Sequence, residues 1–181
     1  MFFFPGIGFE SLSLSLSCIC VSWFVRYTSG SVFYKKLNET LRNPIRAKLL
    51  PYYPYLQIFL SSLRKLRADP AKLPSKPLWR GINADLRSAF KLHSTVVWWG
   101  VSSCSMDPTV ADGFSSGSSM AMVFEIHAQR AVAIASHSAF PTEQEYLLPP
   151  GSQLSVTEIR QPQKNRCHVI LHELDDEFLI A

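Results

Sequence analysis

Three prolines within the nine residues Asp69–Pro77 divide this chain of 181 residues into two parts with different hydrophobic patterns. Before this segment, apolar residues recur every three or four positions, which is the period of an amphipathic helix. After it, short apolar runs alternate with Gly, Ser and Pro, which is typical of strands joined by turns. The segment is interpreted as a linker. The sequence therefore predicts an α+β fold, with a helical lobe first and a β-rich lobe second.

Two amphipathic helices are predicted in the helical lobe. The first spans Ser31–Arg42 and ends at Asn43-Pro44, because proline disfavours helical backbone in the residue before it. The second runs from about Tyr55 to Arg67 and is closed by Ala68-Asp69-Pro70. Each helix has one apolar face, formed by Phe33, Leu37 and Leu41 in the first and by Leu56, Phe59, Leu60 and Leu63 in the second.

Six strands and one short helix are predicted in the β-rich lobe. The helix begins at Asp107-Pro108, which combines a favourable N-cap with a first-turn proline, and reaches about Phe114. Residues 26–181 are expected to form one domain of ordinary size. The predicted strands are Leu78–Ile82, Thr95–Trp99, Ala121–Ile126, Ala131–Ala135, Gln153–Ile159 and His168–Leu174.

Residues 1–25 differ from the rest and are predicted to lie outside the functional domain. Only Glu10 is charged before Val25, and Ser and Leu alternate from residue 11 to residue 17. A secretory signal would need a basic start, and the 15 uncharged residues Ser11–Val25 fall short of the ~20 that span a bilayer. An apolar leader, a strand with one apolar face and an artefactual extension stay open. No firm membrane anchor is expected.

Charge and simple motifs exclude several classes of function. Residues 1–91 hold 14 Lys and Arg against 4 Asp and Glu, a net charge of +10, whereas residues 92–181 hold 4 against 10, a net charge of −6. This asymmetry fits three interpretations: binding of nucleic acid, binding of an anionic cofactor, or attraction between two lobes across a cleft. The basic residues lack the aromatic interleaving of nucleic-acid-binding motifs, so no such partner is expected. Cys167-His168 with His172 and Glu173 lacks the second cluster that a zinc site needs.

Three separated motifs carry side chains suited to chemistry. Arg80-Gly81 lies in the first predicted strand, so a guanidinium stands where the backbone can be approached closely. Ser103-Cys104-Ser105 follows the aromatic strand that ends at Trp98-Trp99. Glu143-Gln144-Glu145 lies between two proline-containing turns, and in an extended segment its two carboxylates point to the same side. Each motif alone is common.

Together, and in this order, the motifs resemble those of the arginine-specific mono-ADP-ribosyltransferases, whose defining triad is Arg, Ser and a Glu within a Glu-x-Glu pair. The match rests on Leu78-Trp79-Arg80-Gly81, on Ser103-Cys104-Ser105 and on residues 138–150, and it extends over about Tyr27–Leu174. Cys104 replaces the usual Thr, and we expect this to be tolerated because the flanking serines point to the other face. The cysteine framework and hydrophobic C-terminal tail of vertebrate surface-anchored members are missing.

The resemblance implies an ADP-ribosyltransferase-like fold, with two packed sheets around a cleft, and transfer of ADP-ribose from the co-substrate NAD to a guanidinium. Departure of nicotinamide builds positive charge on the ribose, as in glycoside hydrolysis. The resemblance assigns stabilisation of that charge to Glu145, positioning of Glu145 to Ser103, and contacts with pyrophosphate and ribose to Arg80. The Gly81 backbone is expected to receive the nicotinamide amide, and Glu143 to orient the acceptor and take its proton. No metal is expected.

Two alternatives to the transferase stay open at this stage. One is an NAD glycohydrolase, in which water replaces the acceptor, and the other is a catalytically inactive member that binds a nucleotide or a protein. The implied acceptor is an arginine-bearing protein or a small guanidino compound. The sequence does not fix the compartment: the cytoplasm is favoured over a lipid-anchored surface location, and secretion is the alternative if residues 1–25 act as a leader.

Overall fold

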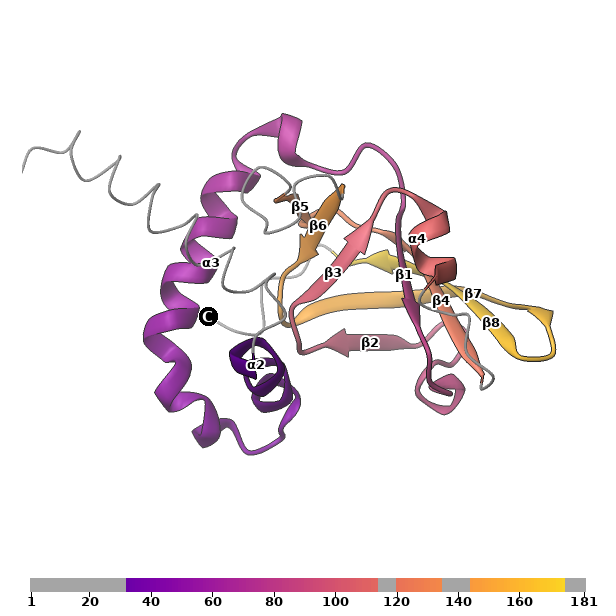
Figure 1. Ribbon diagram of the computed structural model, residues 1–181, viewed down its shortest axis with the longest axis horizontal. Helices are drawn as coiled ribbons and strands as arrows, with labels where there is room; N and C mark the ends of the chain where they lie inside the picture. Colours follow the sequence, from indigo (N-terminus) through magenta and orange to yellow (C-terminus); the bar gives the residue numbers. More distant parts are fainter. Residues whose placement is uncertain (1–31, 114–119, 135–143, 175–181) are drawn as a thin grey trace, which may run out of the picture.

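The computed structural model describes residues 32–113, 120–134 and 144–174 (Figure 1). The described residues before the predicted linker are mostly helical. Both predicted helices are confirmed. The sequence pattern does not predict a 3-10 helix between them, where Pro51 interrupts any α-helical period. Residues 1–25, which are predicted to lie outside the functional domain, are not among the described residues, and no described helix is long and apolar enough to cross a membrane. The elements are α2 (Val32–Arg42), η1 (Arg46–Tyr52), α3 (Tyr53–Arg67) and η2 (Pro70–Lys72).

Among the described residues, eight strands follow the helical lobe, which consists of α2, η1 and α3. The six predicted strands are confirmed, one of them with the predicted bounds, and two short strands are new. Asp107 caps α4 as expected, since its Oδ1 accepts the Thr109 N–H at 2.9 Å. The elements are β1 (Leu78–Ile82), η3 (Arg87–Ala89), β2 (Thr95–Trp98), β3 (Ser102–Ser105), α4 (Pro108–Gly113), β4 (Ala121–His127), β5 (Val132–Ala133), β6 (Glu145–Leu148), β7 (Ser152–Gln163) and β8 (Arg166–Glu173).

The strands form one mixed sheet in the order β2-β7-β8-β4-β1-β3-β6-β5. The predicted α+β fold is confirmed, and the strands of its β-rich core are joined at one place. A single residue pair, Trp79 opposite Ser105, joins β1 to β3 and so links the group β2-β7-β8-β4-β1 to the group β3-β6-β5. The two groups can therefore pack around a common core while their backbones remain continuous at this junction.

Two cores lie on opposite sides of β3 and β6. Cys104, Tyr146 and Leu148 face the larger core, which the strands β1, β4, β7 and β8 also fill. Leu147 and Val101 face the smaller core, which α2 and α3 complete with residues such as Leu37 and Phe59. Because side chains alternate along a strand, Ser103 points to the helical-lobe side whereas Cys104 points away from it. The helical lobe thus covers the face of the sheet that carries Ser103.

The helical lobe approaches the strand lobe closely at Gly100. A Cβ at this position would lie 2.6 Å from the Asn38 Oδ1, so any larger residue would require the buried Asn38 side chain of α2 to shift. Nearby, the Arg46 guanidinium lies over the Trp99 ring, 3.8 Å from its centroid. Such a cation–π contact favours a fixed distance between the lobes. The contact of Arg46 with Trp99 holds η1 beside the segment that leads into β3, the strand that carries Ser103.

Candidate active site

Strand pairing brings Ser103 and Glu145 together although 42 residues separate them. In the antiparallel pair β3–β6, Ser105 lies opposite Glu145 and Ser103 opposite Leu147. Residues opposite each other share a face, so Ser103 and Glu145 are diagonal neighbours on one face, within reach of a long side chain. The Ser103 hydroxyl donates a hydrogen bond of 2.7 Å to the Glu145 Oε1. The glutamate is 8% exposed, so this bond fixes a largely buried carboxylate.

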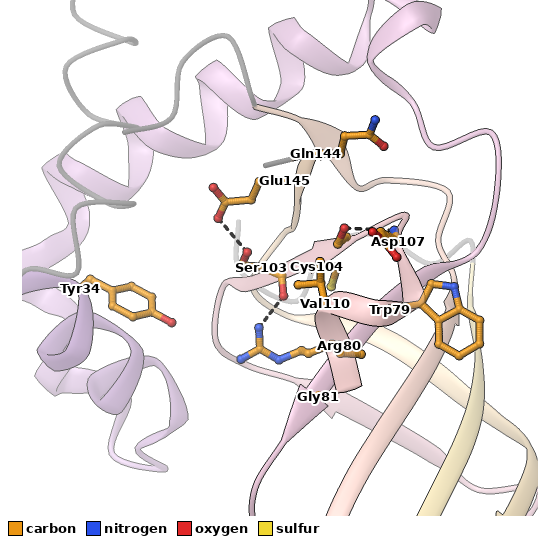
Figure 2. Close-up of a pocket in the computed structure, with 12 residues that line it drawn as sticks. Tyr34, Trp79, Arg80, Gly81, Ser103, Cys104, Asp107, Val110, Gln144 and Glu145 are labelled. Atoms are coloured by element: carbon orange, nitrogen blue, oxygen red, sulfur yellow. Dashed lines mark hydrogen bonds between the residues drawn. The ribbon is translucent and has the colours of Figure 1, made fainter. Parts of the chain in front are cut away.

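Arg80 reaches the same place from β1. Its Nη1 donates to the Ser103 carbonyl oxygen at 2.5 Å, across the junction where β1 and β3 share only one residue pair. The bond uses one of the five N–H donors of the guanidinium. Arg80, Ser103 and Glu145 thus converge from three strands, as Figure 2 shows. The structure thus brings these three residues of the predicted motifs together.

A pocket of about 520 Å³ contains this group. Its volume lies within the usual range of small-molecule sites, ~300–1,000 Å³. Tyr34, Trp79 and Asp107 also line it, and the sequence pattern did not predict a place in the site for any of them. Tyr34 comes from α2 and its hydroxyl end points towards the strand residues (Figure 2), so the helical lobe supplies one wall. The lining residues are Tyr34, Trp79, Arg80, Gly81, Ser103, Cys104, Ser105, Asp107, Val110, Ala111, Gln144 and Glu145.

Cys104 does not supply a nucleophile to this pocket. Its side chain is in the larger core, and desolvation by burial raises the pKa of its thiol to about 12. The thiol is therefore protonated at neutral pH. The expected direction of the serines is confirmed, because Ser103 faces Glu145 while Cys104 faces the core. Cysteine in place of threonine leaves the hydrogen bond from Ser103 to Glu145 intact.

A second pocket of about 470 Å³ shares Arg80 with the first. Aromatic and aliphatic side chains dominate its wall, and Arg42 adds a second guanidinium. Phe124 at its base packs edge-on against Trp98, with 5.3 Å between the ring centroids. The two pockets together therefore offer an apolar compartment, a polar compartment and one arginine between them. The aromatic residues of the second pocket are Phe90, Trp98, Trp99 and Phe124.

The sequence analysis also considered Glu143 and a possible group of zinc ligands. Glu143 lies outside the described residues, whereas Gln144 beside it is exposed at the pocket. Of the residues weighed as zinc ligands, Cys167 faces the larger core and His168 lies next to Trp79 and Glu125. Among residues 32–113, 120–134 and 144–174, no group of three or more His, Cys, Asp or Glu is suited to hold a metal ion.

Comparison with known proteins gives one family and one fold. The model of the family described as NAD:arginine ADP-ribosyltransferase matches residues 22–178. No curated protein matches the sequence significantly.

Solved structures of bacterial ADP-ribosyltransferases share the fold. Vis of Vibrio splendidus, in complex with agmatine, is 18% identical, with a TM-score of 0.67 over 95% of this chain and 88% of that chain. HopU1 of Pseudomonas syringae is 20% identical, with a TM-score of 0.67 over 85% of this chain and 75% of that chain. Exoenzyme S of Pseudomonas aeruginosa, in complex with human 14-3-3 protein beta and bound to carba-NAD, is 17% identical, with a TM-score of 0.64 over 89% and 76%.

Proposed function

Because this chain belongs to the NAD:arginine ADP-ribosyltransferase family, we propose that Arg80, Ser103 and Glu145 are the residues with which it binds NAD and transfers ADP-ribose. The reaction of the family moves ADP-ribose from NAD to an arginine guanidinium and releases nicotinamide. The observation that carries the assignment is the bond from the Ser103 hydroxyl to the Glu145 carboxylate, in one pocket with the Arg80 guanidinium.

Glu145 is proposed to stabilise the positive charge that develops on the ribose when the bond to nicotinamide breaks. Nicotinamide departs as a neutral molecule, so the step needs an anion near the ribose and no general acid. A carboxylate held in place by a hydrogen bond needs little reorganisation as the charge forms, which is the condition for effective electrostatic stabilisation. Ser103 acts as the positioning residue because its hydroxyl donates to Oε1.

The shared position of Arg80 supports a division of NAD between the two pockets. We place the nicotinamide riboside half beside Glu145, and the adenosine half against the aromatic wall formed by Trp98 and Trp99. The pyrophosphate would then lie at Arg80, where a planar guanidinium can bind two phosphate oxygens at once. Gly81 lines the first pocket, which fits a backbone contact with the nicotinamide amide.

Glu143 is proposed to serve the acceptor. A guanidinium has a pKa of ~12.5–13.8 and must lose a proton as it attacks, so a second carboxylate is needed to orient it and take that proton. The structure of Vis with agmatine supports a guanidino acceptor, either a small compound or an arginine of a protein. Glu143 stands two residues before Glu145 in the sequence, the spacing that puts two carboxylates on one side wherever a chain is extended.

An assay of nicotinamide release separates these roles. The protein is incubated with NAD, with and without agmatine. Glu145→Ala should lose release under both conditions, whereas Glu143→Ala should lose only the agmatine-dependent part. Gln144→Ala is the matched control from the same Glu-Gln-Glu motif and should keep both. Retained agmatine modification by Glu143→Ala would overturn its assignment, and retained release by Glu145→Ala would overturn the proposed site.

The same assay distinguishes the two alternatives. Release that does not depend on agmatine, with no modified agmatine formed, would identify an NAD glycohydrolase. Calorimetric binding of NAD without any release would identify an inactive binding module. Agmatine-dependent release with a stoichiometric ADP-ribosylagmatine product supports the transferase.

A further inference from the structure

The 3-10 helix η1 places its residues in three rows. A 3-10 helix has three residues per turn, so side chains three positions apart lie above one another. The row of Arg46, Leu49 and Tyr52 faces inwards: Leu49 is 3% exposed, and Tyr52 packs against the core of the helical lobe. The other two rows face solvent and lie outside both pockets described above. Each of these outer rows continues by one residue beyond each end of η1. One row consists of Pro44, Ala47, Leu50 and Tyr53, and the other consists of Ile45, Lys48, Pro51 and Pro54.

The outer rows are almost entirely apolar. Leu50 is 59% exposed, Ile45 56% and Tyr53 44%, which are high fractions for large apolar side chains in a folded protein. Lys48 is the only charged residue in the two rows, and its long stem can lie along apolar surface while its ammonium stays in water. Figure 1 shows this connection between α2 and α3 at the edge of the molecule, and the residues of both outer rows are exposed.

The segment of the chain that carries these rows has charged side chains of one sign only. Residues 40–68 contain six Lys and Arg and no Asp or Glu. Along α3, Arg64 and Lys65 lie 11 and 12 residues after Tyr53 and are exposed, as are Gln57 and Ser61 between them. Eleven residues correspond to three turns of an α-helix, so Arg64 follows Tyr53 on the same side, roughly 17 Å away at ~1.5 Å per residue, and Lys65 is its neighbour, one position further round the helix.

We propose that the outer rows of η1 and the solvent-facing side of α3 bind a membrane surface that carries anionic lipids. Leu50 and Tyr53 would enter the boundary between headgroups and acyl chains, where leucine and tyrosine are favourable. Arg64 and Lys65 would contact the headgroups, since each cation near an anionic surface adds to attraction. An acidic protein would match the cations, but it would not account for the exposed large apolar side chains.

Co-sedimentation with lipid vesicles tests the proposal with the full chain. One set of vesicles contains phosphatidylcholine alone, and the other also contains phosphatidylserine. The wild-type protein should bind the second set, and less at higher salt because the charges are exposed. The variant Leu50→Ser/Tyr53→Ser should bind about tenfold more weakly, since it removes apolar side chains from the contact. Arg64→Gln/Lys65→Gln should bind about 30-fold more weakly, at ~1 kcal/mol per cation.

The matched control is Leu92→Ser, which removes a leucine of similar exposure, 52%, from the strand lobe. It should bind vesicles like the wild type. All three variants should keep the wild-type unfolding temperature and agmatine-dependent nicotinamide release, so a loss of binding cannot be a loss of fold or site. Equal affinity for both vesicle sets, no vesicle binding, or equal weakening by Leu92→Ser would overturn the proposal. So would capture by soluble polyglutamate without vesicle binding, which would indicate an acidic protein partner.

Discussion

Replacing Ser103 by alanine removes one hydrogen bond and leaves the proposed catalytic carboxylate in place. The hydroxyl donates to the Glu145 Oε1 at 2.7 Å. The carboxylate is 8% exposed, so little water is available to replace the lost donor. We therefore expect Ser103→Ala to act on the chemical step, because Glu145 would no longer be held where the ribose charge develops.

The size of the effect follows from the kind of bond. A hydrogen bond to a charged group contributes about 1.5–3 kcal/mol when one partner is removed. Since each 1.36 kcal/mol corresponds to a factor of about ten in rate, kcat should fall by about 10- to 150-fold. The affinity for NAD should change much less, because the Arg80 guanidinium bonds to the Ser103 backbone oxygen, which alanine retains. Ser103→Thr keeps a hydroxyl and should recover most of the rate.

Ser105→Ala is the matched control for this measurement. Ser105 lies on the same face of β3, but its hydroxyl accepts the Asp107 N–H at 3.0 Å and supports the turn into α4. Its loss should cost about 1 kcal/mol of stability. For a chain of this size that lowers the unfolding temperature by about 2–4 °C. The kcat for agmatine-dependent nicotinamide release should stay within about twofold of the wild-type value. This change corresponds to less free energy than one hydrogen bond contributes.

Either of two results would refute this role of Ser103. If Ser103→Ala keeps kcat within about threefold of the wild type, the bond contributes less than one kcal/mol and does not position Glu145 for the reaction. If calorimetry instead shows that NAD affinity falls as much as kcat/KM while kcat is unchanged, Ser103 acts in binding alone.

Three buried contacts give further predictions. Gly100→Ala should lower stability by about 1–3 kcal/mol, because its Cβ would lie 2.6 Å from the Asn38 Oδ1; an unchanged thermal unfolding temperature would contradict this. Glu173→Gln should cost about 3–5 kcal/mol in urea unfolding, because it removes the negative charge that Arg130 pairs with in the interior; a loss below about 1 kcal/mol would refute the importance of that pair. The Cys104 thiol should resist a thiol reagent at neutral pH until the protein unfolds, because its pKa is raised to about 12 and the reactive thiolate forms only as pH rises towards that value; rapid labelling of the folded chain would disprove it.

Local patterns predicted the elements that depend on local physics. The bounds of β1 follow from a short apolar run between proline and a polar turn, and the observed strand has the same bounds, Leu78–Ile82. The helices follow from their apolar periodicity, and α4 follows from the cap at Asp107. The triad was predicted through family resemblance, because its residues lie on different strands and no local rule connects Arg80 with Glu145.

Long-range pairing explains what the sequence did not predict. The strands β3 and β6 have four residues each, and Ser-Cys-Ser carries little strand propensity, so they are strands because they pair with each other. Tyr34 lines the pocket because of how α2 packs on the sheet, and nothing in its local pattern distinguishes it from the other side chains of that helix. The junction of Trp79 with Ser105 is a matter of register between segments 26 residues apart, which composition and periodicity do not encode.

The place of the site in the sheet connects these observations. The backbone pairing between the two groups of strands is reduced to one residue pair, and beside that pair the Arg80 guanidinium donates to the Ser103 carbonyl. Arg80 therefore joins β1 to β3, the strand that pairs with the Glu145 strand β6. Its remaining N–H donors are available to the pocket. Lysine would keep the charge but not the planar fork that makes both contacts at once. A ligand phosphate that binds Arg80 would thus contact the same side chain that links the two groups of strands.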